Sequence, residues 1–171
     1  MTMTGGYMTA GAPPAGRAAI AAWCFYDWAN SAVPTIITTF LFSTYFTSAV
    51  ARDPTLGTAQ WAHANSLAAL LVAVASPVLG AIADQGGRRK PWLLVLSLTC
   101  VVGTAALWFV RPDPADVAFA LTMVVVATVG FELGTTFYNA MLPDLVPAGR
   151  IGRVSGWGWG LGYAGGLTCL V

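Results

Sequence analysis

Charged residues are scarce in this chain, at 9% of its 171 residues. An ordinary soluble domain carries about 25% charged residues, so too few are present to cover a water-facing surface. The formal net charge is +1, and no basic block has the size typical of a nucleic-acid-binding protein. Hydrophobic residues make up 57% of the chain and fall in long runs, which favours lipid as the surrounding solvent.

Patterns for catalysis or metal binding are also missing. Cys24, Cys100 and Cys169 each lie in an apolar run, and no CxxC or Cys/His spacing supports a zinc site or a redox pair. The sequence has no Ser/His/Asp arrangement and no glycine loop that precedes a Lys-Ser/Thr pair. We therefore predict that the protein is not an enzyme and needs no cofactor or metal ion.

Five apolar stretches approach the roughly 20 residues that a helix needs to cross the hydrocarbon core. Short connections join them, so consecutive helices should be antiparallel neighbours. The predicted fold is an all-α, polytopic membrane helix bundle over residues 18–171. Residues 1–17 are rich in Gly, Thr, Ala and Pro and are expected to form a disordered tail. The predicted spans cover about residues 23–50, 62–83, 91–110, 117–139 and 154–171.

The positions of the basic residues predict the orientation, because cytoplasmic loops of membrane proteins are enriched in Lys and Arg. One side of the predicted bundle would carry Arg17, Arg88, Arg89, Lys90, Arg150 and Arg153. The other side would carry Arg52 and Arg111. We therefore expect an integral protein of the cell membrane with a cytoplasmic N-terminus.

The connection between the second and third spans, Gly80–Lys90, has an ordered set of glycine and charged positions. Gly80 would let a neighbouring helix approach closely, and Asp84 lies one turn later on the same face. Asp84 could accept hydrogen bonds from the exposed amides of a neighbouring helix N-terminus, and Gly87 permits a sharp turn. The basic residues that follow could hold Asp84 or anionic lipid headgroups, or could serve only to fix the topology.

This connection resembles the signature loop of the major facilitator superfamily, with the pattern G-x-x-x-D-x-x-G-R-R-K matched at every defining position. In that family the loop is thought to latch the two halves of the transporter together in one conformation. The run from Tyr26 to Ala32 and the segment from Phe137 to Pro147 resemble the branch related to the autophagy vacuolar effluxers. The residues to which the latch role would carry over are Gly80, Asp84, Gly87, Arg88, Arg89 and Lys90.

The resemblance implies a twelve-helix transporter in two halves, of which this chain supplies about five helices of the first. Its implied function is secondary transport of a small solute by alternating access, with amino acids as the substrates of eukaryotic relatives. Because the sequence stops in an apolar run at Val171, we expect a truncated piece whose C-terminal half is missing. The alternative is a non-transporting membrane protein, either an assembly partner or the remnant of a broken gene.

Polar residues form a stripe on the first span, where Asp27, Ser31, Pro34 and Thr38 recur at helical spacing. A carboxylate at the centre of a span costs about 2.5–3.5 kcal/mol, so it usually faces a cavity or a partner. Asp27 is also close enough to the cytoplasmic end to be solvated at the interface, and both interpretations stay open.

A second stripe in the fourth span consists of Thr128, Glu132, Thr135, Thr136 and Asn139. A carboxyl inside the bundle suits proton exchange, whereas a packing role would need hydrogen bonds to neighbouring Thr or Tyr residues. Many proton-coupled members of the family carry an arginine in this helix. No arginine is present here, so the usual coupling scheme does not carry over. The predicted substrate or proton path consists of Asp27, Asn30, Glu132 and Asn139.

Glycines spaced by four residues, Gly158, Gly162 and Gly166, form a flat face on the fifth span. Small residues at this spacing predict close packing against another helix. The antiporter signature of the family also lies in this span, but its proline is absent here, so antiport is not supported. Trp157 and Trp159 suit the membrane interface, and they could also line a substrate path.

Overall fold

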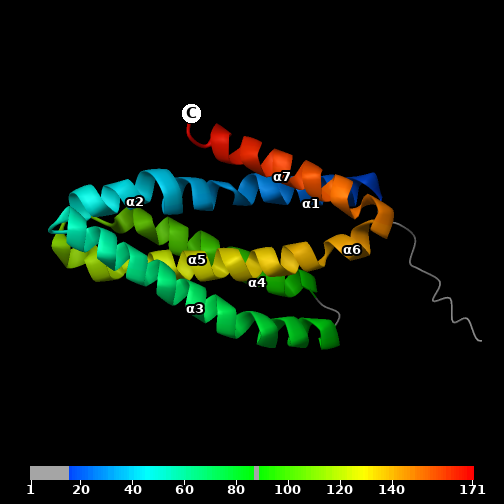
Figure 1. The fold of residues 1–171 in the computed structure, drawn as a ribbon, viewed down its shortest axis with the longest axis horizontal. Coiled ribbons are helices and arrows are strands. Elements are labelled where there is room, and N and C mark those ends of the chain that lie inside the picture. The colour runs from blue at the N-terminus through cyan, green and yellow to red at the C-terminus, as the bar shows by residue number, and fades with distance from the viewer. Residues whose placement is uncertain (1–15, 87–88) are drawn as a thin grey trace, which may run out of the picture.

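The computed structural model describes residues 16–86 and 89–171, with side chains over 16–82 and 89–171. All regular elements in this part of the chain are helices that run back and forth along one long axis (Figure 1). The prediction of an all-α helix bundle is confirmed. Residues 1–15 of the predicted tail lie outside the described residues, as do Gly87, Arg88 and the side chain of Asp84.

The first span is one continuous rod whose winding changes along its length. It consists of α1 (Arg17–Asn30), η1 (Val33–Phe40), α2 (Leu41–Tyr45) and η2 (Phe46–Val50). The segments η1 and η2 are π-helical, with hydrogen bonds across five residues instead of four. Pro34 lies at the start of η1 and cannot donate a backbone hydrogen bond. The wider winding changes which side chains share a face of the rod.

Two of the remaining helices begin at an aspartate cap. Asp53 caps α3 by accepting a hydrogen bond from the Leu56 backbone N–H at 2.9 Å. Asp113 accepts a hydrogen bond from the Ala115 N–H at 2.8 Å at the start of the fourth span. The elements are α3 (Pro54–Gly86), α4 (Arg89–Ala106), η3 (Leu107–Phe109), η4 (Pro114–Asp116), α5 (Val117–Ala140), α6 (Leu142–Leu145), η5 (Ala148–Arg150) and α7 (Ile151–Thr168).

Within the described residues, four helical stretches are long and apolar enough to cross a membrane by length and composition. Their outward faces are strongly apolar and exposed, with Val74 at 67% and Val102 at 64% exposure. Such surfaces suit hydrocarbon rather than water. The fifth predicted span falls on α7. The four stretches are Arg17–Val50, Pro54–Ile82, Arg89–Phe109 and Pro114–Leu145.

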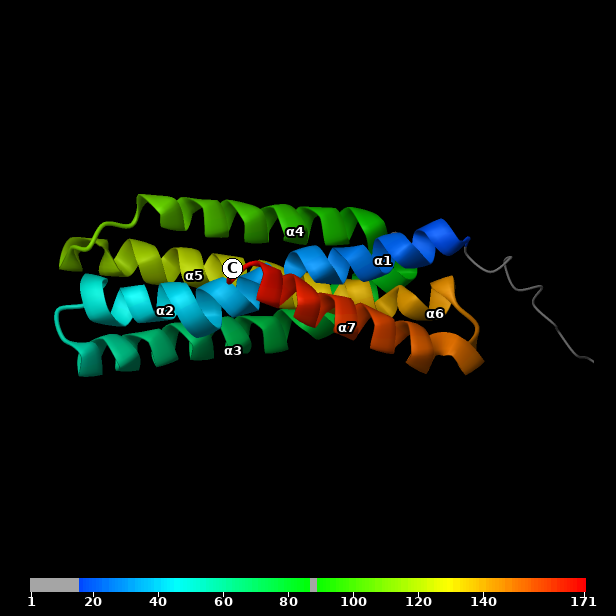
Figure 2. The same ribbon diagram turned by 90° about the horizontal axis from the view of Figure 1, so that it is seen from above.

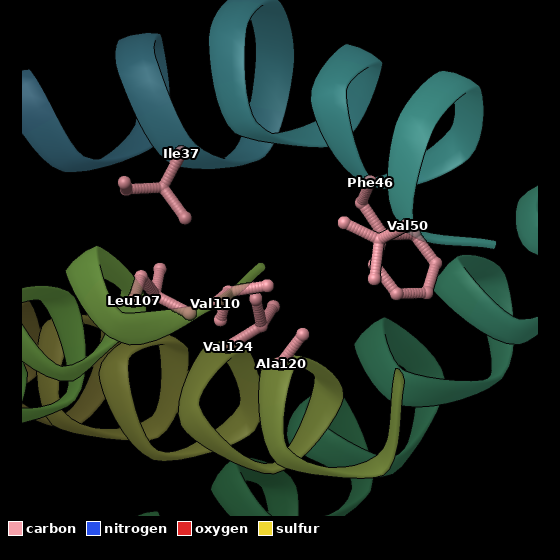
Figure 3. Packing of buried hydrophobic residues seen from close by; sticks show 7 residues of the cluster. All are labelled: Ile37, Phe46, Val50, Leu107, Val110, Ala120 and Val124. Atoms are coloured by element: carbon pink, nitrogen blue, oxygen red, sulfur yellow. The ribbon is translucent and has the colours of Figure 1, made fainter. Parts of the chain in front are cut away.

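A compact apolar cluster fills one end of the bundle, where the first span turns into α3 and where α4 leads to the fourth span (Figures 1 and 3). Phe46 and Val50 are fully buried in it. The Tyr45 hydroxyl adds a hydrogen bond of 3.1 Å to the Val110 carbonyl. The buried members shown in Figure 3 are Ile37, Phe46, Val50, Leu107, Val110, Ala120 and Val124.

The helix α5 packs against both α4 and α3, and the approach to α4 depends on glycine. A methyl group added at Gly130 would lie 2.7 Å from the Cys100 backbone N and 2.8 Å from the Leu96 carbonyl oxygen. Both distances are below van der Waals contact, so only glycine fits between these two backbones. Small residues at helix contacts are the usual means of close packing in membranes.

The helix α7 lies along α1, as both ribbon views show (Figures 1 and 2). Three glycines predicted to form a packing face lie on this contact. A methyl group at Gly158 would meet the Trp23 ring, and one at Gly166 would meet the Thr35 hydroxyl. One at Gly162 would lie 2.8 Å from the Asp27 Oδ2 atom. The glycine face therefore leaves room for polar side chains of the first span.

Candidate functional site

Two neighbouring cavities open between the helices of the bundle. Cavity one has a volume of about 490 Å³ and lies between the first span, α3 and α5. Cavity two has a volume of about 480 Å³ and lies between the first span, α5 and α7. Both volumes fall in the range of small-molecule sites, roughly 300–1,000 Å³.

Cavity one has a mostly apolar wall with a few polar side chains. Glu132 and Thr128 come from α5, Asn65 comes from α3, and Thr38 comes from η1. The Asn65 amide donates a hydrogen bond of 2.9 Å to the Trp61 carbonyl, which fixes its orientation at this wall. Cavity one thus combines one carboxyl group with one amide and two hydroxyls.

Cavity two is more polar along the first span. Asp27, Ser31 and Thr35 are lined up there, and Thr135 and Asn139 face them from α5. The Ser31 hydroxyl donates to the Asp27 carbonyl, and the Thr35 hydroxyl donates to the Ser31 carbonyl, each at 2.8 Å. These local bonds hold both hydroxyl groups on their own helix. Neither hydroxyl donates to the Asp27 carboxylate.

The two cavities share Pro34 and Phe131 as a common wall. The π-helical segment after Pro34 contributes side chains to both cavities. Thr38 lines cavity one, whereas the adjacent Thr39 lines cavity two and donates a hydrogen bond of 2.8 Å to the Pro34 carbonyl, five residues earlier. Adjacent residues of a helix point in different directions, so this single turn can present side chains to both cavities.

Tyr138, which lines cavity two, is part of an aromatic stack. The rings of Trp23 and Tyr138 stack with centroids 4.2 Å apart and planes at 8°, and the rings of Tyr26 and Tyr138 stack with centroids 5.1 Å apart. The Trp23 indole N–H donates to the Tyr138 carbonyl at 3.1 Å. The hydroxyls of Tyr26 and Ser97 share a hydrogen bond of 2.8 Å, so the stack links α1 to both α5 and α4.

The structure brings together only part of the predicted path. Asp27 and Asn139 line cavity two, and Glu132 lines cavity one. Asn30 is not among the lining residues of either cavity. Of the two tryptophans on α7 considered as path residues, Trp159 lines cavity two and Trp157 does not.

Several lining residues were not identified from the sequence. Asn65 is an isolated amide in the second span, and its position within an apolar run was the only available signal. Phe131 and Tyr138 look like ordinary core aromatics in sequence. Thr35 and Thr39 also line cavity two, and their spacing of four residues from Ser31 onward was the signal that could have found them.

The described part of the predicted latch lies at the end of the bundle near the start of α1. Arg89 ion-pairs with Asp144 at 2.5 Å and donates to the Ala140 carbonyl at 2.7 Å, so it joins α4 to the end of α5 and to α6. A methyl group at Gly80 would meet no atom within 4 Å. Lys90 is exposed. Gly87, Arg88 and the Asp84 side chain belong to the part outside the description.

The described residues contain no group of three or more His, Cys, Asp or Glu side chains placed to hold a metal ion. Their polar groups can instead bind a solute through a carboxylate, amides and hydroxyls.

Comparison with known proteins gives a family and one informative relative. The model of the Major Facilitator Superfamily matches residues 9–168. The chain is 34% identical over 146 residues to the uncharacterized MFS-type transporter YxiO of Bacillus subtilis (strain 168). This alignment covers 84% of the chain and 34% of the relative, so the chain spans about a third of that transporter. No solved structure matches the chain.

Proposed function

The chain belongs to the Major Facilitator Superfamily, and on that premise we propose that it forms most of the first half of a secondary active transporter for a small solute. The family match favours a transporter over an enzyme and does not favour a non-transporting remnant. The observation that carries the proposal is the pair of cavities between the helices, each with one carboxyl side chain. Intramembrane carboxyl groups usually mark a solute or proton path.

In the proposed mechanism the solute binds between this half and a second half, and the two halves rock around it to give alternating access. Cavities one and two would form this half's contribution to the site. The second half would come from a longer polypeptide, since the relative is about three times as long as the aligned region. A reading frame that continues beyond Val171 for about seven further spans would support this arrangement.

The two carboxyl groups have different proposed roles. Asp27 and Asn139 would contact the solute in cavity two, and Glu132 would exchange a proton in cavity one. We expect Glu132→Gln to abolish uptake driven by a proton gradient and to leave solute exchange across proteoliposomes intact. Exchange needs no net proton movement, so loss of both activities in Glu132→Gln would contradict this division.

Amino acids are the first solutes to test, because the run from Tyr26 to Ala32 is similar to the vacuolar effluxers. The experiment is uptake by the full-length protein in proteoliposomes, with a panel of amino acids and other small solutes under an imposed proton gradient. We expect gradient-dependent accumulation of at least one solute. The chain of 171 residues alone should give none, because the proposed site needs both halves; uptake by this chain would overturn the proposal.

The loop from Gly80 to Lys90 would latch the two halves in one conformation. The contacts of Arg89 with Ala140 and Asp144 support a loop that is anchored to the rest of its own half. We expect Asp84→Asn in the full-length protein to impair transport and to leave membrane insertion unchanged. Normal transport rates in this variant would argue against a latch.

The basic residues support an N-terminus in the cytoplasm and insertion in the cell membrane. Tags placed before Arg17 and beside Arg89 should report the same cytoplasmic compartment. Tags at Arg52 and Arg111 should report the outside. Opposite compartments for Arg17 and Arg89 would contradict the proposed orientation.

A further inference from the structure

Cavity two combines a single carboxylate with a wall that holds no described basic side chain. Among the described residues, the Asp27 carboxylate has no hydrogen bond or ion pair. Its Oδ2 atom lies where the absent side chain of Gly162 leaves space on α7. A charged group inside a membrane bundle needs a partner, and the lining residues that the structure describes supply none.

Aromatic rings surround the same space. Trp159 and Tyr163 come from α7, with ring centroids 6.1 Å apart and exposed fractions of 62% and 68%. Phe131 and Tyr138 line the cavity from α5. The Tyr138 hydroxyl is buried and has no hydrogen-bond partner among the described residues. Aromatic faces attract cations, and they also pack well against an apolar body.

We propose that cavity two binds the ammonium group of an amine-bearing organic solute, with Asp27 as its counter-charge and with the aromatic faces of Trp159 and Tyr163 against both the ammonium group and its carbon skeleton. This inference rests on the proposed transport function and names the class of solute. The cavity volume of about 480 Å³ suits a small organic cation rather than a bare metal ion. A carboxylate with aromatic walls disfavours anions, because no described basic group lines either cavity.

The test is binding to the purified full-length protein in detergent, measured by isothermal titration calorimetry at neutral pH. The panel consists of choline, phenethylamine and cadaverine, with phenethyl alcohol as the neutral match of phenethylamine and hydrocinnamate as an anion. At least one amine should bind, and phenethyl alcohol and hydrocinnamate should not. Equal binding of the amine and its neutral match, or no binding by any amine, would overturn the proposal.

Variants test the two parts of the site separately. Asp27→Asn should weaken amine binding roughly tenfold to a hundredfold, the range for a lost charge-assisted interaction. Trp159→Leu should weaken it roughly twofold to thirtyfold through the lost cation–π contact. The matched control is Asp116→Asn, which lies outside both cavities and keeps an oxygen to accept the Arg111 N–H. Amine binding should be unchanged in this control. Undiminished amine binding by Asp27→Asn would contradict the proposal.

Three further outcomes test this inference, and the last two distinguish it from the transport function. In one outcome, sodium chloride gives a heat of binding that disappears in Asp27→Asn, and no amine gives any heat. This result would make cavity two a sodium site and overturn the amine proposal. Uptake of solutes without an amine by a protein that binds no amine would reject only the solute class. Amine binding without any transport would reject the transport function and leave the site intact.

Discussion

A methyl group at Gly130 offers the sharpest test of the packing in this bundle. The new carbon would lie 2.8 Å from the Leu96 carbonyl oxygen, whereas a close carbon–oxygen contact is about 3.3 Å. It would also lie 2.7 Å from the Cys100 backbone N. Backbone atoms cannot rotate away, so α4 and α5 must separate by about half an ångström. Overpacking of this kind costs about 1–3 kcal/mol.

Gly134 supplies the matched control, one turn later on the same helix and also buried. A methyl group there would have its nearest neighbour, the Tyr26 hydroxyl, at 3.7 Å, which is ordinary contact. Both Gly→Ala changes gain the same helix propensity of roughly 1 kcal/mol. The difference between the two variants therefore isolates the clash, and the Gly130→Ala protein should be less stable by about 1–3 kcal/mol.

The assay is thermal unfolding in detergent, followed with a thiol-reactive dye. Cys24 and Cys100 are buried and report unfolding, and Cys169 is exposed, so Cys169→Ser serves as the background for both variants. At about 2–4 °C per kcal/mol for a protein of this size, Gly130→Ala should melt roughly 2–12 °C below Gly134→Ala. Equal melting temperatures would refute the inferred contact between the two backbones.

Two smaller effects follow from polar contacts. Tyr26→Phe removes the hydrogen bond to Ser97 and should destabilise the protein by about 1 kcal/mol in thermal unfolding, and adding Ser97→Ala should cost little more. A fully additive double variant would show that the two hydroxyls do not interact. Asp144→Asn removes the ion pair with Arg89. The Arg89 side chain is 27% exposed and the Asp144 side chain is 68% exposed, so water screens the pair. The free energy of unfolding should fall by about 0–1 kcal/mol, and the effect should shrink at high salt. A larger loss that does not depend on salt would contradict a solvent-screened pair.

The helical bundle could be predicted from sequence because the bilayer imposes a length on each apolar run. The wide π-helical segment from Val33 to Phe40 could not be predicted in the same way. Its winding depends on hydrogen bonds freed by Pro34 and on packing against distant helices, and neither leaves a periodic signal.

The candidate site could be predicted from the sequence only in part, for a related reason. Asp27 and Asn139 stand out as polar residues within apolar spans, and the structure places both in cavity two. Glu132 stands out equally, yet it lies in cavity one because Phe131 comes between the two spaces. The assignment of side chains to cavities depends on the relative rotation of packed helices, which a single sequence does not reveal.

The wall formed by Pro34 and Phe131 has a consequence for the range of solutes. Pro34 is part of the helix itself, whereas the ring of Phe131 is the portion that a single substitution can remove. Phe131→Ala would join the two compartments and roughly double the room for a bound molecule. In the proposed transporter, one aromatic ring would then limit the size of the solute, and bulkier compounds should gain entry when that ring is lost.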